Sequence, residues 1–366
     1  PARGERIETA SKPAQATDAR RLTAKAFRAA AAKVRPSVVR IETYGGVFDP
    51  DRSTPPPAPR GRPSPRPRRP RATARPGEGP TTGLVVSPDG LILTSTFAFV
   101  REPPIITVAL ADGSRHVARL LGRDETRRLC LLKIDGADDL PLPASVPRDR
   151  LRVGQWAVAV GVGYGAEQPA LSAGIVSATH RIFGRAVQTD ANLSPANYGG
   201  PLVDIDGRVI GLCVPLSPMP RAGGGGGMRW YDSGIGFAVP LAGLDAVIER
   251  MARGEVIRPG RLGVRVAPVE DGAGARIEEV IEDTPAATAG LAKDDILAAV
   301  DGEAVRDVLH VRLLVGRHVA GDAITLTVRR GDEELQVTAT LDAGEEVQAP
   351  PRPFDLGGGG GPEPSD

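Results

Sequence analysis

The stretch TTGLVVSPDGLILTS, residues 81–95, decides how the middle of the chain folds. Two short runs of strand-forming residues flank Pro88, Asp89 and Gly90. Proline presets φ at the start of a turn, aspartate hydrogen-bonds to nearby backbone, and glycine tolerates positive φ. The pattern therefore predicts two strands joined by a tight turn.

Similar short strands lie on both sides of this hairpin, each ended by glycine, proline or polar residues. They are predicted at SVVRIET (37–43), IITVAL (105–110), HVARLLG (116–122), LCLLKID (129–135), WAVAVGV (156–162), AGIVSAT (173–179), PLVDI (201–205), VIGLCV (209–214) and GIGFAVP (234–240). Many short strands with little helix predict an all-β barrel or sandwich. Helices are expected only at its ends, over the alanine-rich residues 17–34 and over 241–253, where apolar residues follow a helical period.

Composition argues against several classes of function. The 45 acidic and 46 basic residues nearly cancel, so no overall field favours nucleic acid. No apolar run approaches ~18 residues, so no transmembrane span is expected. Because no metal-binding or dinucleotide motif occurs, we expect no metal and no cofactor. Cys130 and Cys213 lie in apolar runs, which favours buried free thiols over a disulfide.

Two segments have compositions that do not support a packed core. Residues 50–80 carry seven arginines between Arg60 and Arg75, interleaved with proline. We expect a disordered loop there, either a solvated insertion or a docking site for an acidic partner or a membrane surface. The tail 343–366 contains five consecutive glycines and is also expected to be disordered.

A second pattern, of strands mixed with short helices, occupies residues 259–342. Strands are predicted at LGVRVAPV (262–269), ARIEEVI (275–281), ILAAVDG (296–302), AITLTVRR (323–330) and ELQVTATL (334–341). Helices are predicted after Pro285 and over 306–316. A segment of this size folds as a domain of its own.

Five motifs of the middle segment resemble the protease domain of the HtrA/Deg family of trypsin-like serine proteases. They are TTGLVVSPDGLILTS, LRVGQWAVAVG (151–161), LSAGIVSAT (171–179), VQTDANLSPANYGGPLVDIDGRVIGL (187–212) and SGIGFAVP (233–240). Residues 259–342 resemble the PDZ domain that follows it, through RLGVRV, TPAATAGLAKDDILAAVDGEAV and GDAITLTVRRG. The resemblance implies an all-β fold, a chymotrypsin-like double β-barrel, followed by a small mixed α/β PDZ domain.

The resemblance also implies domain bounds and a cellular location. We expect an N-terminal segment over 1–25, the protease-like domain over 26–253 with the Arg/Pro-rich loop inside it, the PDZ domain over 259–342, and the tail. The resemblance implies a periplasmic or otherwise exported location and frequent assembly into trimers. The chain begins at Pro1 without a signal-peptide pattern, which fits a processed export signal or a trimmed chain.

The catalytic triad of the family needs a Ser nucleophile, a His base and an Asp that orients the base. By resemblance these positions are Tyr198 before GGPL, Phe97 in the base motif, and Arg128 in the orienting motif. Ala196 stands where the family has a glycine that helps to form the oxyanion hole. Because a phenol, a phenyl ring and a guanidinium do not transfer protons as the triad does, the sequence predicts a pseudoenzyme with no functional catalytic residue.

The three replaced side chains are expected to meet in the cleft, with the Arg128 guanidinium over the ring of Phe97 or Tyr198. The alternative is a displaced triad. The four histidines lie outside the base motif, which argues against that alternative; they are His116, His180, His310 and His318.

The PDZ resemblance implies capture of an extended C-terminal peptide as an added strand. Its binding residues are expected to be the carboxylate loop, the strand after it and two positions on the facing helix. These are Leu262, Gly263, Val264, Arg265, Val266, His310 and Leu314. A solvent-exposed His310, and a PDZ domain that only packs on the barrels, are the alternatives.

The sequence therefore predicts a catalytically inactive HtrA-like scaffold or regulator in envelope protein quality control. Expected partners are unfolded or C-terminal peptides of exported proteins and active HtrA-type relatives, in a homo- or hetero-oligomer. Two alternatives stay open: an active serine endopeptidase that degrades misfolded exported proteins, and a structural module of an envelope assembly.

Overall fold

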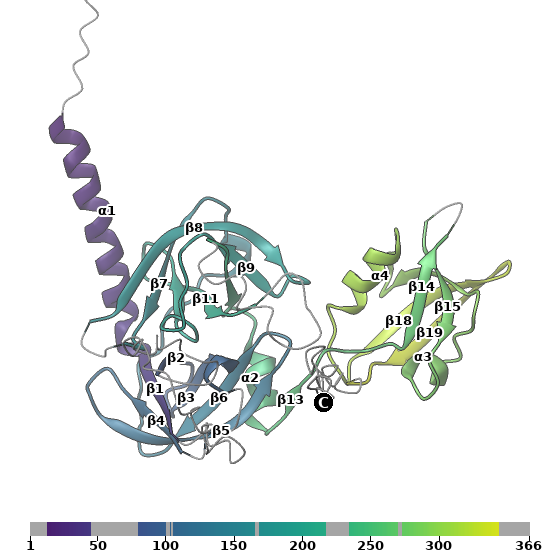
Figure 1. Ribbon diagram of the computed structural model, residues 1–366, viewed down its shortest axis with the longest axis horizontal. Coiled ribbons are helices and arrows are strands. Elements are labelled where there is room, and N and C mark those ends of the chain that lie inside the picture. The colour runs from purple at the N-terminus through teal and green to yellow at the C-terminus, as the bar shows by residue number, and fades with distance from the viewer. Residues whose placement is uncertain are drawn as a thin grey trace, which may run out of the picture.

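The computed structural model describes residues 13–44, 80–99, 103, 105–164, 168–216, 234–269 and 273–343 (Figure 1). Side chains of residues 13–22 and of Tyr44 are outside this description. The segments predicted to be disordered, 50–80 and 343–366, lie outside the described residues except for Pro80 and Ala343.

The first barrel is built from six antiparallel strands. They are β1 (Val38–Tyr44), β2 (Thr81–Val85), β3 (Leu91–Ser95), β4 (Ile105–Ala109), β5 (Arg115–Asp124) and β6 (Leu129–Ile134). The sheet runs β5-β4-β1-β2-β3-β6, and pairing of β5 with β6 closes it. A short strand, β13 (Val256–Ile257), adds to β5 in parallel. The hairpin β2–β3 turns through Gly90, whose φ is 98°, as the sequence predicted.

The second barrel is also closed and six-stranded. Its strands are β7 (Trp156–Gly161), β8 (Ala170–Arg181), β9 (Ala186–Thr189), β10 (Pro201–Val203), β11 (Val209–Val214) and β12 (Gly236–Pro240). The interiors of the two barrels hold separate apolar clusters that include Cys130 and Cys213 respectively. Both thiols are free and buried, and burial raises the pKa of each to about 12.

Helices cover the barrels at the two places that the sequence predicted. Helix α1 (Pro13–Val34) packs Ala30, Ala31 and Val34 into an apolar cluster that residues of both barrels share. At its N-terminal end the helix extends away from the barrels (Figure 1). The 3₁₀ turn η1 (Arg35–Ser37) ends it, because Pro36 has no N–H to continue the helix. Helix α2 (Asp245–Ala252) packs the buried Met251 beside β5. Further 3₁₀ turns are η3 (Thr96–Phe99) and η4 (Arg148–Arg150).

The C-terminal domain is a sheet with two helices packed on it. Its elements are β14 (Val264–Pro268), β15 (Ala275–Val280), α3 (Pro285–Thr288), β16 (Ile296–Val300), β17 (Glu303–Ala304), α4 (Val308–Val315), β18 (Ala323–Arg330) and β19 (Glu333–Thr340). The strand order is β14-β15-β16-β18-β19, so β14 is an edge strand. The all-β double barrel followed by a small mixed domain confirms the predicted fold.

A buried arginine joins the second barrel to the C-terminal domain. Arg185, in the β8–β9 connection, donates from Nη2 to the carbonyl oxygen of His318 over 2.9 Å. Its side chain also lies over the ring of Phe183, 6.0 Å from the centroid. Burial lowers the pKa of Arg185 to about 10, so the guanidinium stays charged at neutral pH.

Candidate functional site

Threonine hydroxyls hold the loop between β9 and β10, residues 190–200, against the first barrel. This loop lies where the two barrels meet, and we call it the seam loop. Thr81 donates from Oγ1 to the carbonyl oxygen of Tyr198 over 2.7 Å, and Thr82 donates to that of Ala196 over 2.7 Å. Thr82 Oγ1 also accepts the N–H of Val162 over 2.9 Å, so this one hydroxyl joins both barrels. Thr94 donates in turn to the carbonyl oxygen of Thr82 over 2.8 Å.

The two glycines after Tyr198 allow this loop to approach the backbone of both barrels. Gly199 has a φ of +80°, and a Cβ there would lie 2.1 Å from the carbonyl oxygen of Thr82. A Cβ on Gly200 would lie 2.3 Å from the carbonyl oxygen of Val160. Larger residues are therefore excluded at both positions, which explains the GG pair physically.

The sequence-predicted positions 97 and 198 do come together. Phe97 lies in η3 of the first barrel, and Tyr198 lies in the seam loop of the second. Their ring centroids are 5.2 Å apart with an angle of 53° between the planes. Tyr198 is buried and packs in the core cluster of the second barrel, with Phe97 against it. This aromatic contact bridges the two barrels.

Arg128 does not complete the expected arrangement. Its φ is +60°, and its carbonyl oxygen accepts the N–H of Thr96 over 2.9 Å. Across the described ranges, the cation–π contact found is that of Arg185 with Phe183. The prediction that the Arg128 guanidinium stacks on Phe97 or Tyr198 is therefore wrong, and the carbonyl oxygen of Arg128 supports η3 instead.

The backbone N–H groups of the seam loop point into the loop itself. The carbonyl oxygen of Ser194 accepts the N–H of Asn197 over 2.8 Å and that of Tyr198 over 3.2 Å. The Ser194 hydroxyl donates to Asn197 Oδ1 over 3.0 Å. Ala196 has no positive φ, unlike Gly199. An oxyanion hole needs N–H groups aimed at the reacting oxygen, so in this conformation the Tyr198 N–H does not serve as one.

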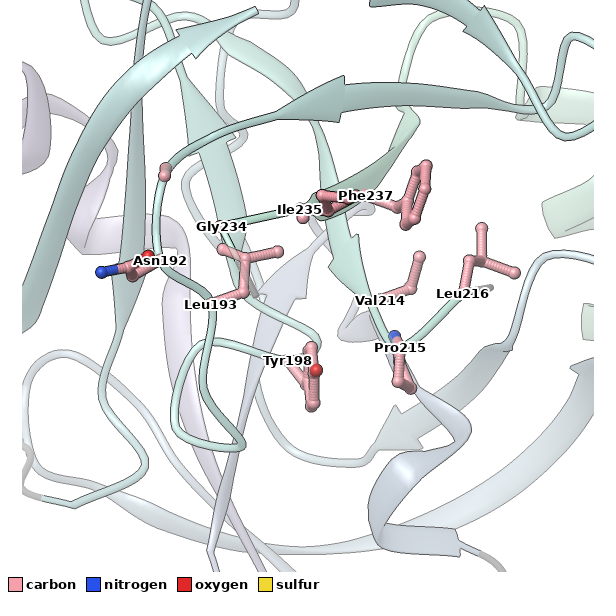
Figure 2. Close-up of a pocket in the computed structure, with 11 residues that line it drawn as sticks. Asn192, Leu193, Tyr198, Val214, Pro215, Leu216, Gly234, Ile235 and Phe237 are labelled. Atoms are coloured by element: carbon pink, nitrogen blue, oxygen red, sulfur yellow. The ribbon is translucent and has the colours of Figure 1, made fainter. Parts of the chain in front are cut away.

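A small pocket with mainly apolar side chains opens beside Tyr198 (Figure 2). Its walls come from the seam loop, the end of β11 and the start of β12. They are Ala191, Asn192, Leu193, Tyr198, Val214, Pro215, Leu216, Gly234, Ile235, Gly236 and Phe237. The accessible space inside it is about 10 Å³, which is room for about one water molecule, so in this conformation the pocket is closed to a side chain.

The histidines make their contacts outside this region, as the sequence predicted. His116 bonds to Ser114 and to the backbone of Asp135, and His180 lies next to Thr179. The other two, His310 and His318, are in the C-terminal domain.

A groove of about 560 Å³ lies between β14 and α4 in the C-terminal domain. It is lined by Gly260, Arg261, Leu262, Gly263, Val264, Arg265, Val266, Glu278, Val311, Arg312, Val315 and Gly316. Five of the predicted binding residues, 262–266, are among these. His310 and Leu314 lie outside the lining. Sequence reasoning missed Val311, Arg312 and Val315, although their helical spacing already placed them on one face.

His310 and Leu314 are held in the interior of the domain instead. His310 is 5% exposed, its Nδ1 lies 3.3 Å from the N–H of Arg306, and its Nε2 lies 3.4 Å from Glu303. Leu314 is 2% exposed and belongs to the core of the domain. Both residues therefore support α4 from behind rather than facing the groove.

The loop at the mouth of the groove has a fixed backbone. Gly263 has a φ of +89°, and a Cβ there would lie 2.2 Å from the side chain of Thr284. Thr284, which is 2% exposed, donates from Oγ1 to the carbonyl oxygen of Ile281 over 2.6 Å. The carbonyl oxygen of Leu262 accepts the N–H of Ala286 over 2.9 Å. The groove is thus preformed.

Two closed antiparallel barrels with a loop held at their seam define a trypsin-like peptidase fold, here followed by a peptide-groove domain. Family models agree: residues 81–212 match the trypsin-like peptidase domain, and residues 260–341 match the PDZ domain.

Curated relatives and solved structures extend this agreement. A probable periplasmic serine endoprotease DegP-like from Chlamydia muridarum is 31% identical over 71% of this chain and 53% of its own length. One from Marinomonas sp. is 32% identical over 72% and 56%. The serine endoprotease from Yersinia pestis superposes with a TM-score of 0.60 at 27% identity, over 86% of this chain and 97% of that one. The HtrA-type protease AlgW with decapeptide gives 0.62 at 28%, over 86% and 98%.

The chain belongs to the HtrA type of trypsin-like proteases with a C-terminal PDZ domain. It spans about half the length of the curated relatives that it matches. Within the described part of the chain, no helix is both long and apolar enough to cross a membrane.

These relatives overturn one prediction from the sequence. They are named serine endoproteases, so the family is proteolytic, and the prediction that this chain is a pseudoenzyme is wrong by that comparison. The assignment of the triad positions to Phe97, Arg128 and Tyr198 is a separate matter, and it stays a prediction that rests on the motifs.

The threonine seam leads to a prediction about stability. In Thr82→Val the carbonyl oxygen of Ala196 and the N–H of Val162 lose their partner in the interior. Each buried unpaired group costs about 1–3 kcal/mol, so the free energy of unfolding should fall by at least that much. Urea unfolding followed by tryptophan fluorescence measures this change, because both tryptophans, Trp156 and Trp230, precede the PDZ domain.

Thr82→Ser is the matched control, since it keeps the hydroxyl and loses one methyl group. Its unfolding midpoint should stay close to that of the unaltered chain. Equal midpoints for the valine and serine variants would show that the hydroxyl does not hold the seam.

Proposed function

We propose that the chain serves protein quality control in the cell envelope by binding extended segments of exported proteins, with endoproteolysis as the activity that its relatives support. The observation that carries the binding part is the preformed groove beside β14. The outer side of β14 has no partner in the described sheet, whose order begins with this strand. A sheet edge beside a groove is the arrangement that captures a peptide as an added strand.

The groove has separate places for the backbone and the terminal side chain of a peptide. Backbone N–H groups of residues 262–264 receive the C-terminal carboxylate in this proposal, and β14 pairs with the peptide backbone. Leu262, Val264, Val311 and Val315 form an apolar site for the last side chain. Because Gly263 and Thr284 fix the loop in advance, little ordering entropy is lost on binding.

Location and proteolysis are proposed from the relatives. The curated relatives are named periplasmic, which supports an exported location for this chain. Their name as serine endoproteases supports cleavage of unfolded exported proteins.

Assembly is a further part of the proposal, with a trimer implied by the family resemblance and HtrA-type relatives as additional partners. Apolar side chains exposed near the base of α1 support it. Trp156 is 46% exposed and contacts the ring of Phe27 edge-on, and Val153 is 63% exposed.

Peptide capture predicts dependence on a free C-terminus. A fluorescein-labelled peptide with an apolar last residue should raise its anisotropy when the full chain is added. The same peptide with an amidated C-terminus should bind about tenfold or more weakly, because hydrogen bonds to a charged group contribute about 1.5–3 kcal/mol. Equal affinity of the two peptides would contradict capture by the loop 262–264.

Proteolysis is tested with reduced casein, an unfolded substrate, and the purified chain. The proposed activity predicts fragments that accumulate with time, and less cleavage when a seam-loop hydroxyl is removed by Ser194→Ala or Tyr198→Phe. Ser114→Ala, in an exposed turn of the first barrel, is the control that should cleave normally. Intact casein after long incubation at high chain concentration would contradict the proteolytic part and leave the peptide measurement to decide binding.

A further inference from the structure

We infer that Arg312 determines the specificity of the groove, which selects peptides with an acidic side chain two residues before an apolar C-terminal residue. This inference rests on the proposed peptide binding and adds the chemical class of the peptide. Arg312 lies on α4 among the residues that line the groove, next to Val311 and three residues before Val315.

The other groove arginines are already neutralised. Arg261 makes a two-point ion pair with Asp342, with Nε–Oδ1 and Nη2–Oδ2 distances of 3.1 Å. Arg265 pairs with Glu279 over 2.8 Å.

Among the described residues, the exposed side chain of Arg312 makes no ion pair and no hydrogen bond. Neighbouring arginines on the same stretch of chain do have partners: Arg306 contacts His310, and Arg317 pairs with Glu303. Arg312 is therefore the positive charge without an acidic partner in the described lining of the groove, which leaves it open to a carboxylate on a bound peptide.

The position of Arg312 along the helix fixes which peptide residue it meets. The C-terminal end of α4 lies at the mouth of the groove, because Gly260 donates its N–H to the carbonyl oxygen of His318 and Pro259 bridges to Val319. Arg312 is four residues before Gly316, or about 6 Å along a helix that rises ~1.5 Å per residue. A strand advances ~3.3 Å per residue, so Arg312 lies beside the residue about two positions before the C-terminus.

Alternation along the peptide agrees with this assignment. Side chains two apart on a strand point to the same face, so the upstream side chain and the apolar terminal one both face α4. Glu278, the acidic residue in the lining, lies on β15, on the other side of β14 from α4. It forms no ion pair with Arg312 within the described structure, so it leaves the arginine available to the peptide.

The test uses three peptides that share an apolar C-terminal residue and differ two residues upstream, with Glu, Gln or Lys. Fluorescence anisotropy with the full chain measures their dissociation constants. The Glu peptide should bind about two- to fivefold more tightly than the Gln peptide, the range expected for a solvent-accessible ion pair. The Lys peptide should bind more weakly than the Gln peptide.

Two charge-reversal variants then separate the role of Arg312 from a general charge effect. Arg312→Glu should reverse the ranking, so that the Lys peptide binds best. Lys293→Glu, which makes the same change of charge at an exposed position outside the groove, should keep the original ranking. Arg312→Gln should abolish the preference for the Glu peptide over the Lys peptide. Unchanged binding of the Gln peptide by this variant would show that the domain still folds.

Three outcomes would overturn the inference. An unchanged ranking in Arg312→Glu would show that another residue reads the peptide. A loss in Arg312→Gln that is equal for all three peptides, and absent for an amidated peptide, would place Arg312 on the terminal carboxylate. Failure of all three peptides to bind the unaltered chain would contradict the proposed function itself, and the inference with it.

Discussion

The buried hydroxyl of Thr82 is the contact on which the arrangement of the barrels depends. It is fully buried, donates to the seam loop at Ala196 and accepts from Val162 at the end of β7. A hydrogen bond in this environment contributes modestly when made but costs much more when one partner is lost. The seam loop therefore has one favourable position, and the Phe97–Tyr198 contact and the apolar pocket follow from it.

In the PDZ domain, too, a buried threonine fixes a loop that faces a cleft. A buried threonine, Thr284, lies against a glycine of positive φ, Gly263, and fixes the loop that leads into β14. In both domains a loop that faces a cleft is supported by side chains that never reach solvent. The two sites differ in which backbone groups stay available to a peptide. The N–H groups of Asn197 and Tyr198 are bonded within the seam loop, whereas β14 has one edge without a partner strand.

Most of the fold could be predicted from the sequence, because turn residues and alternating apolar runs mark nearly every strand. The exceptions are short. Strand β9 has four residues, and β13 and β17 have two each, so neighbouring strands rather than their own residues determine them. The two short helices of the PDZ domain were also expected where they occur.

The candidate sites were only partly predictable. Motifs located positions 97 and 198 and the loop 262–266, since these are matters of spacing along the chain. His310 and Leu314 were expected in the groove, but both are buried in the interior of the domain, and a helical pattern alone does not show which side of α4 faces inward. The lack of an acidic partner for Arg312 could not be predicted either, because it depends on which arginines the acidic side chains contact in the folded domain. The pseudoenzyme prediction came from three residue types alone, and the names of the relatives contradict it.

Amide hydrogen exchange tests the central functional claim most directly, that the edge of β14 binds a peptide backbone. The full chain is compared with and without a peptide that ends in an apolar residue. The account predicts slower exchange in residues 262–266, with little change in the barrels. Unchanged exchange in this segment at saturating peptide, or protection confined to the barrel cleft, would contradict it.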